Sequence, residues 1–209
     1  MRPLLVLLAG LLATPVASAA DHEIAVEMGT LASPDWTSWS MVSGPTFALG
    51  FGLRGDYALN DHWAIQAGWH HVRTGRTLRV QDYHHVVGQT AYFGNEAAVG
   101  VRYDWPLWDL LVPYAHVDGL LWIADARFDD DPYNAQSAGQ VKNMALAGGG
   151  RGMLGAEVRI PRKRPDRRGF TGALFLEGGY TWLSTQHFAT LGDITLRGFT
   201  FRSGLALVY

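Results

Sequence analysis

The chain has 209 residues, a formal net charge of −2 at neutral pH, 12% aromatic residues and 25 glycines, but no cysteine. The near-neutral charge provides no basic face for nucleic acid, and the lack of cysteine excludes a disulfide framework. After the N-terminal segment no uninterrupted run of 18 apolar residues occurs, which excludes a membrane-spanning helix.

The N-terminal segment has the three parts of a secretory signal peptide. Arg2 supplies the positive charge, residues 4–13 form an apolar core, and Ala17-Ser18-Ala19 provides the small residues of a cleavage site. The alternative is a membrane anchor, but the apolar core has only half the length of a spanning helix. We therefore expect a signal peptide at residues 1–20, cleaved after Ala19 or Ala20, and one exported domain at 21–209.

The remaining chain alternates between large apolar residues and small or charged residues. In the first such segment Ile24 and Val26 share one face, and Glu23 and Glu27 share the other. A period of two residues predicts β-strands. Eight segments show it: 22–29, 46–57, 62–72, 95–105, 111–123, 144–160, 172–183 and 198–209.

The links between these segments alternate in length. Three are short: 58–61, 105–110 and 161–169. The other four, 30–45, 73–91, 124–142 and 184–194, are longer, more polar and richer in Gly, Asp, Ser and His. Short turns on one side and long loops on the other are typical of transmembrane barrels. The sequence therefore predicts an all-β fold, an eight-stranded antiparallel up-and-down transmembrane β-barrel.

A soluble exported barrel or sandwich would also alternate, with its polar face in water. Such a face should be rich in Lys, Glu and Thr, but here it carries Gly, Ala, Arg, Glu and His. That composition suits a narrow barrel interior, where glycines allow the strands to curl tightly. The membrane barrel is the favoured interpretation.

Aromatic residues gather near the predicted strand ends. One of them, Trp108, lies in a short link. Tyrosine and tryptophan prefer the boundary between membrane and water, so we expect two girdles. The residues assigned to them are Tyr57, Trp63, Trp69, Tyr103, Trp105, Trp122, Tyr180 and Trp182.

Four sequence stretches resemble a known family. The tail FTFRSGLALVY resembles the C-terminal signature of bacterial outer-membrane proteins, while YALNDHWAIQAGW, LVPYAHVDG and FLEGGYTW resemble strands of small OmpA-type and opacity-type barrels. The resemblance covers essentially the whole mature chain. It implies an outer-membrane location in a Gram-negative bacterium. It also implies an assembly signal, formed by Phe201, Leu205, Leu207 and Tyr209 and read by the barrel assembly machinery.

The same resemblance implies contact with outer-membrane lipid and lipopolysaccharide, and we expect a monomer. The family includes adhesins, structural barrels, small pores and lipid-modifying enzymes, so the resemblance does not choose among these functions. The chain lacks the peptidoglycan-binding domain of some members, so no cell-wall tether is implied.

Charged residues on the predicted inner face are the first candidates for function. By parity they are Glu27, Arg54, Asp56, Arg102, Asp104, Asp118, Glu157, Arg159, Glu177 and Arg202. Buried charges must pair, because an isolated one costs several kcal/mol. We expect a structural plug of salt bridges. The alternative is a gate whose pairs exchange to pass ions, although a barrel of eight strands is only wide enough for side chains to fill.

Two groups suggest a metal. His70-His71 and His84-His85 bracket a long loop that contains Asp82, but adjacent histidines on a strand point to opposite faces. The run Asp129-Asp130-Asp131 lacks the spacing of a calcium loop, and a solvated acidic tip is the favoured interpretation. We expect no metal and no cofactor.

An enzyme that modifies lipid A is the alternative from another functional class. Ser184 and His187 lie near an outer strand end, and His71 could face lipid. No Gly-x-Ser-x-Gly occurs, and no carboxylate shares their face to orient a catalytic histidine. We therefore expect a protein that is not an enzyme, with a structural or surface-interaction role. A small gated pore is the main alternative. The loop at 30–45, with Trp36, Trp39 and Met41, is expected to fold over the barrel mouth or to contact a partner.

Overall fold

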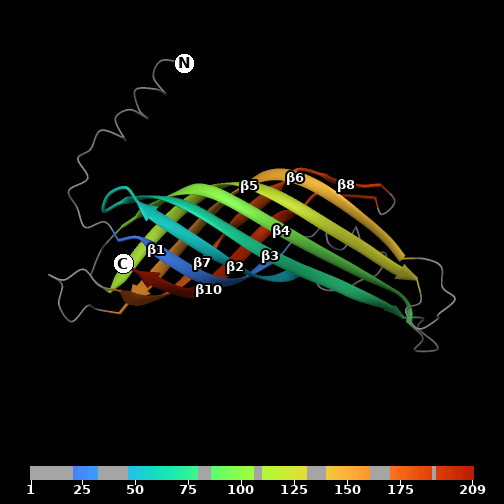
Figure 1. Cartoon of the computed structure of the whole chain (residues 1–209), viewed down its shortest axis with the longest axis horizontal. Helices are drawn as coiled ribbons and strands as arrows, with labels where there is room; N and C mark the ends of the chain where they lie inside the picture. The colour runs from blue at the N-terminus through green and yellow to red at the C-terminus, as the bar shows by residue number, and fades with distance from the viewer. Residues whose placement is uncertain are drawn as a thin grey trace, which may run out of the picture.

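The computed structural model describes residues 21–32, 47–79, 86–105, 110–130, 140–160, 170–189 and 192–209. These residues form a closed barrel with the strand order β1-β10-β7-β6-β5-β4-β3-β2, together with a separate two-stranded hairpin, β8-β9 (Figure 1). The barrel strands are β1 (Glu23–Ala32), β2 (Phe47–Ala58), β3 (Trp63–Arg79), β4 (Val86–Asp104), β5 (Leu111–Asp130), β6 (Gln140–Arg159), β7 (Thr171–Leu183) and β10 (Arg197–Val208). The predicted eight-stranded antiparallel up-and-down barrel is confirmed.

The last strand closes the barrel against the first. The β1–β10 register runs from Glu23 opposite Val208 to Ala32 opposite Phe199. Two further backbone hydrogen bonds between His22 and Tyr209, of 2.8 and 2.9 Å, continue this pairing by one residue. The final tyrosine is thus part of the barrel wall. We call this end of the barrel the proximal end and the opposite end the distal end.

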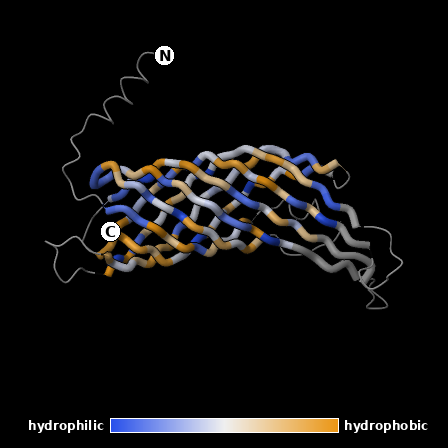
Figure 2. The backbone as a smooth tube through the Cα atoms, viewed as in Figure 1, coloured by the Kyte–Doolittle hydropathy of each residue, from blue (hydrophilic) through white to orange (hydrophobic). Residues whose placement is uncertain are grey.

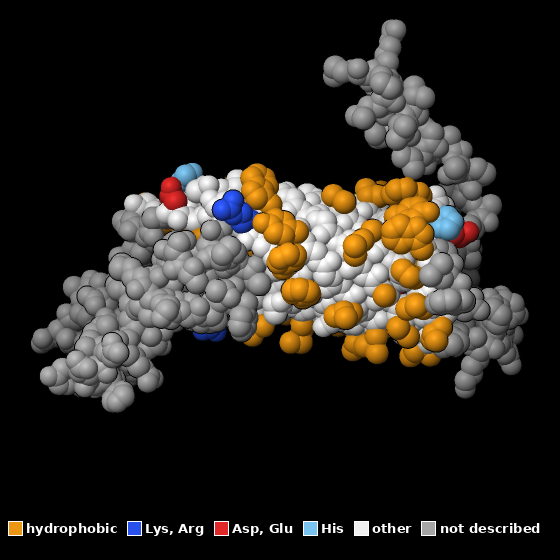
Figure 3. Space-filling model, turned by 180° about the vertical axis from the view of Figure 1, so that it is seen from behind, with side chains coloured by type: hydrophobic (Ala, Val, Ile, Leu, Met, Phe, Trp, Pro, Cys, Tyr) orange, Lys and Arg blue, Asp and Glu red, His pale blue; other side chains and the backbone are white. Residues whose placement is uncertain are grey.

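The two faces of every barrel strand differ sharply in chemistry. Figure 2 shows apolar and polar residues alternating along the strands, and Figure 3 shows apolar side chains covering the outer surface on one side. Each barrel strand exposes a large apolar side chain to 45–69%: Val26, Leu53, Ile65, Val99, Val117, Leu154, Leu176 and Leu205. The outside of the barrel is therefore an apolar belt. Among the described residues, no helix is long and apolar enough to cross a membrane.

Four strands are longer than the sequence predicts. Strands β3 to β6 have 17 to 20 residues, whereas β1, β2, β7 and β10 have 10 to 13. They extend beyond the other strands at the distal end (Figure 1). Much of the predicted loops at 73–91 and 124–142 is thus paired strand. Polar residues continue the hydrogen-bonded ladder there without an apolar stripe to mark it.

The predicted loop at 184–194 also contains regular structure. Strands β8 (Gln186–Phe188) and β9 (Gly192–Ile194) form a short hairpin, with Gln186 opposite Ile194. Phe188, Ile194 and the following Leu196 are buried in a cluster with residues of the barrel wall such as Leu31 and Trp122. The hairpin therefore continues the barrel wall beside β6 and directs apolar side chains toward the distal part of the lumen.

Candidate functional site

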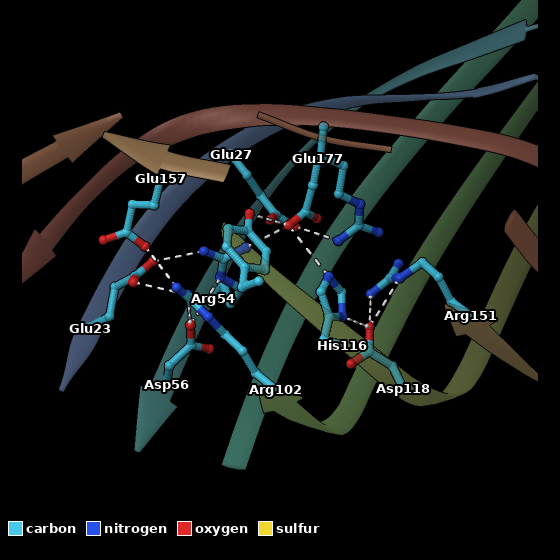
Figure 4. A network of polar contacts seen from close by, with 12 residues as sticks. Glu23, Glu27, Arg54, Asp56, Arg102, His116, Asp118, Arg151, Glu157 and Glu177 are labelled. Atoms are coloured by element: carbon cyan, nitrogen blue, oxygen red, sulfur yellow. Dashed lines mark hydrogen bonds and ion pairs between the residues drawn. The ribbon is translucent and has the colours of Figure 1, made fainter. Parts of the chain in front are cut away.

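The barrel interior is the candidate functional site because most of the buried charge lies there. Four arginines and seven carboxylates are at least 94% buried, and they come from every barrel strand except β3. Figure 4 shows how most of these side chains meet in the lumen. The arginines are Arg54, Arg102, Arg151 and Arg202; the carboxylates are Glu23, Glu27, Asp56, Glu96, Asp118, Glu157 and Glu177.

Arg102 is the centre of the proximal part of this network. Its Nη1 donates to Glu23 at 3.0 Å and to Asp56 at 2.8 Å, and its Nη2 donates to Glu157 at 2.8 Å. Its Nε donates to Asp104 at 2.6 Å. One guanidinium thus joins carboxylates from four strands, which is the geometry that arginine with its planar fork of donors suits best.

Arg54 connects this proximal cluster to the middle of the lumen. Its two Nη atoms donate to Glu23 at 2.7 Å and to Glu177 at 3.0 Å, and its guanidinium lies 4.2 Å from the ring centre of Phe175. Glu177 also accepts a 2.7 Å hydrogen bond from the hydroxyl of Tyr114. The arginine is thus held by both ion pairs and an aromatic face.

His116 continues the network toward the distal end. Its Nε2 lies 3.3 Å from Glu177, and its Nδ1 lies 3.0 Å from Asp118 at ion-pair distance but without hydrogen-bond alignment. Asp118 accepts two hydrogen bonds from Arg151, of 3.0 and 2.7 Å.

Glu96 carries the chain of contacts to the opposite wall. It accepts from Arg151 at 2.6 Å and from Arg202 at 2.8 Å, and Arg202 also donates to Glu27 at 2.6 Å. The contacts thus run without a break from Asp104 to Glu27.

The network is not balanced in charge. Among the described buried residues, carboxylates exceed arginines by three. One oxygen each of Glu27, Asp56, Asp118 and Glu177 has no hydrogen-bond partner among the described residues, and neither has either ring nitrogen of His70. Buried polar atoms of this kind normally bind water or an ion. These unpaired oxygen and nitrogen atoms of the lumen can therefore bind protons, cations or water.

The ten charged residues predicted for the lumen divide into two groups. Eight are buried and belong to the network: Glu27, Arg54, Asp56, Arg102, Asp118, Glu157, Glu177 and Arg202. Asp104 and Arg159 are partly exposed at the proximal end, where they pair with Arg102 and Glu157 of the network, each at 2.6 Å. Arg159 also pairs with Asp21 at 3.1 Å. The prediction missed Glu23, Glu96 and Arg151, although their parity places them on the same face.

Trp122 is the one predicted girdle residue that the structure places elsewhere. Its side chain is 1% exposed, and its Nε1 donates to the hydroxyl of Tyr92 at 2.7 Å. That hydroxyl donates in turn to Gln186 of the hairpin at 2.7 Å. The girdle assignment of Trp122 was wrong, because Trp122 shares the inward parity of His116 and Asp118.

Glycine on the neighbouring strand makes room for this tryptophan. A Cβ atom at Gly94, which faces the lumen from β4, would overlap the Trp122 indole. Gly155 accommodates the Tyr114 ring in the same way across β5 and β6. Several interior glycines therefore serve to seat large side chains, in addition to the tight curvature expected from the sequence.

Replacing Tyr92 by phenylalanine tests the distal cluster. The variant removes the hydroxyl that joins Trp122 to Gln186, which leaves two buried polar groups unpaired. We expect a loss of about 1–3 kcal/mol in the free energy of unfolding, measured by urea unfolding in detergent with tryptophan fluorescence. Tyr180→Phe, on the outward face, is the matched control. Equal stability of the two variants would contradict the role of the hydroxyl.

The other seven girdle residues face outward or lie at the surface. Tyr57, Trp63, Trp69, Trp105, Tyr180 and Trp182 are 37–62% exposed, and Tyr103 is partly buried between Trp63 and Trp105, with ring centres 4.8 and 4.9 Å apart. The four residues of the predicted assembly signal, Phe201, Leu205, Leu207 and Tyr209, also point outward and are 45–59% exposed.

The candidate metal residues are not grouped, but the expectation that no carboxylate shares the face of His187 was wrong, because the hairpin register places Asp193 directly opposite it. His70 faces the lumen, whereas His71 faces outward and contacts Asn95 at 3.0 Å. His187 pairs with Asp193 at 2.9 Å on the exposed side of the hairpin, and the Ser184 hydroxyl accepts from the Gly148 backbone. In the part of the chain that the structure describes, no three His, Asp or Glu residues are grouped to hold a metal.

Several other expectations fall outside the described residues. They concern residues 1–20, Trp36, Trp39, Met41, Asp82, His84, His85, Trp108, Asp131 and the short link at 161–169. Asp129 and Asp130 belong to β5, but their side chains are not described.

No protein-family model matches the chain, and no curated protein sequence is significantly similar to it. Solved structures that are similar to the chain in fold include three outer-membrane proteins. Ail, the attachment invasion locus protein of Yersinia pestis, is 12% identical, with 91% of this chain and 97% of that chain covered and a TM-score of 0.45. Neisserial surface protein A is 11% identical, with 91% and 97% covered and a TM-score of 0.47. The outer membrane protein OprG from Pseudomonas aeruginosa is 13% identical, with 92% and 97% covered and a TM-score of 0.47.

Proposed function

We propose that this protein is an integral outer-membrane barrel with a filled lumen, whose role is structural or depends on its surface. The observation that carries the proposal is that the barrel is apolar outside and charged inside, the reverse of a soluble protein. Large apolar side chains cover the outside of all eight barrel strands, while arginines and carboxylates are buried inside. An apolar patch of this extent is unstable in water but suits hydrocarbon, where a closed barrel also satisfies every backbone hydrogen bond of its wall.

Two layers of side chains support the filled lumen. The ionic network occupies the proximal and middle parts of the lumen (Figure 4), and the apolar cluster that includes Trp122, Phe188 and Ile194 lies on its distal side. A barrel of eight strands has space for side chains and little else. Such a barrel therefore interacts with other molecules through its surface and not through its lumen.

The test of the membrane location is the gel mobility of the outer-membrane fraction, boiled and unboiled. A folded membrane barrel resists unfolding in SDS, so we expect the protein in that fraction with a shift in apparent mass on boiling. A protein found soluble in the periplasm without a shift would overturn the proposal.

A small gated pore is the second candidate function, and one observation favours it. The three excess carboxylates in the lumen would attract cations if the side chains moved apart. For a filled lumen we expect no steady conductance of the purified protein in planar bilayers. Repeated cation-selective openings, absent from a mock preparation, would contradict the filled lumen and support the pore.

The remaining parts of the proposal concern processing and partners. We propose an N-terminal signal peptide that is cleaved on export, recognition of the outward-facing C-terminal residues by the barrel assembly machinery, contact with lipopolysaccharide, and a monomeric state. We also propose that the protein is not an enzyme. Mass spectrometry of lipid A from cells with and without the protein tests this last point, and a changed acyl pattern would contradict it.

A further inference from the structure

Basic residues gather on the outer surface just beyond the distal edge of the apolar belt. The strand register places Arg73, Phe93, Asp125 and Met144 in one row across β3 to β6. Arg127 and Lys142 lie opposite each other in the next row toward the distal end. These strands are the four that extend past the others, so this surface continues directly from the belt.

Among the side chains that the structure describes here, cations outnumber carboxylates. Asp125 accepts from Arg127 at 3.0 Å and pairs with Lys142 at 3.2 Å. The guanidinium carbons of Arg73 and Arg127 lie 5.3 and 5.1 Å from the ring centre of Phe93. Of the described side chains on this surface, three cations therefore share one carboxylate and one aromatic ring. We call Arg73, Arg127 and Lys142 the basic patch.

The cations are accessible as well as clustered. The side chains of Arg127 and Lys142 are 41% and 52% exposed. Each arginine has five N–H donors and lysine has three, far more than the two oxygens of Asp125 can accept. Stacking on Phe93 orders the guanidinium groups and leaves their edges available to a ligand.

Apolar side chains lie immediately below the basic patch. Ile123, Met144 and Leu146 are 42–66% exposed on the same face of β5 and β6. A ligand that fits both parts carries negative charge at one end and hydrocarbon at the other. Phosphate, the common anion of lipid headgroups, accepts bidentate hydrogen bonds from the arginine fork.

We propose that the basic patch binds the phosphate groups of an outer-leaflet glycolipid of the lipid A type, with acyl chains against the belt below. This inference rests on the proposed outer-membrane location. The three cations would supply the electrostatic part of binding, and the exposed side chains of Ile123, Met144 and Leu146 the apolar part. The proposal names a lipid, so a soluble polyanion is a competing occupant.

The test uses the purified full-length barrel in a non-ionic detergent, with lipid A as the probe and native mass spectrometry as the readout. The variant replaces Arg73, Arg127 and Lys142 by glutamine. We expect lipid A to bind at least tenfold more weakly to this variant than to the parent. Dephosphorylated lipid A should bind the parent as weakly as lipid A binds the variant.

Arg197→Gln, which removes an outward-facing cation from the other wall of the barrel, is the matched control and should bind lipid A like the parent. Equal binding of lipid A to the triple variant, or of the dephosphorylated lipid to the parent, would overturn the inference. Binding of a heparin fragment as tightly as lipid A would also overturn it, because acyl chains would then contribute nothing. The boiling shift is measured on the same samples. If the shift is present but lipid A binding does not depend on the basic patch, only this inference fails; if the shift is absent, the proposed membrane location fails.

Discussion

Replacing Arg102 by alanine is expected to lower the free energy of unfolding by about 3–5 kcal/mol. Arg102 donates to Glu23, Asp56 and Glu157 from one guanidinium, and all three carboxylates are almost completely buried. Without the arginine they would repel one another in a medium of low dielectric constant. The measurement is urea unfolding of the refolded protein in detergent, with the temperature of the boiling shift as a second readout.

Arg127→Ala is the matched control for this prediction. Arg127 is a surface arginine that pairs with a single partly exposed carboxylate, and such pairs contribute about 0–1 kcal/mol. If Arg102→Ala fails to refold, Arg102→Lys keeps the charge but loses the fork of donors, and it should fold with intermediate stability. A loss from Arg102→Ala no larger than that of the control would mean that the network does not stabilise the barrel.

The sequence predicts the barrel wall well because one physical rule governs it. A strand between hydrocarbon and a lumen must alternate, and that alternation is visible in all eight segments. The rule fails beyond the belt, where neither face needs to be apolar. The distal parts of β3 to β6 were therefore predicted as loops, although hydrogen bonds pair them as strands.

The partners within the lumen are harder to predict than its residues. Parity alone places Glu23, Glu96 and Arg151 inside, so their omission was avoidable. The pairing of Arg202 with Glu27, which are 175 residues apart, depends on the closure of the barrel. Spacing along the chain carries no information about such a contact.

Trp122 shows why two rules must be weighed against each other. Its place near a strand end suggested a girdle, but its parity pointed inward. The parity rule prevailed because Gly94 leaves space for the indole, while Tyr92 and the hairpin satisfy its N–H group through a chain of hydrogen bonds. The hairpin itself, with strands of three residues, is too short to show a period of two.

The apolar belt leads to the second large effect, which is expected from Val99→Arg. Val99 lies on the outward face of β4, midway between Tyr103 and Asn95 along the strand, and its side chain is 63% exposed. In a lipid bilayer an arginine at this depth should lower the free energy of unfolding by about 2–4 kcal/mol. In water an exposed valine replaced by arginine changes stability by only about 0.5 kcal/mol in either direction.

A second variant, Met144→Arg, tests whether the loss of stability depends on depth in the membrane. Met144→Arg introduces the same side chain at a similarly exposed site, but at the distal edge of the belt. There the arginine can reach the headgroup region, so a loss of only about 0–1 kcal/mol is expected. Both variants are unfolded by urea from phospholipid vesicles under identical conditions. A large difference between the two positions requires a medium whose polarity changes along the barrel axis, and two equally small losses would place both positions in water.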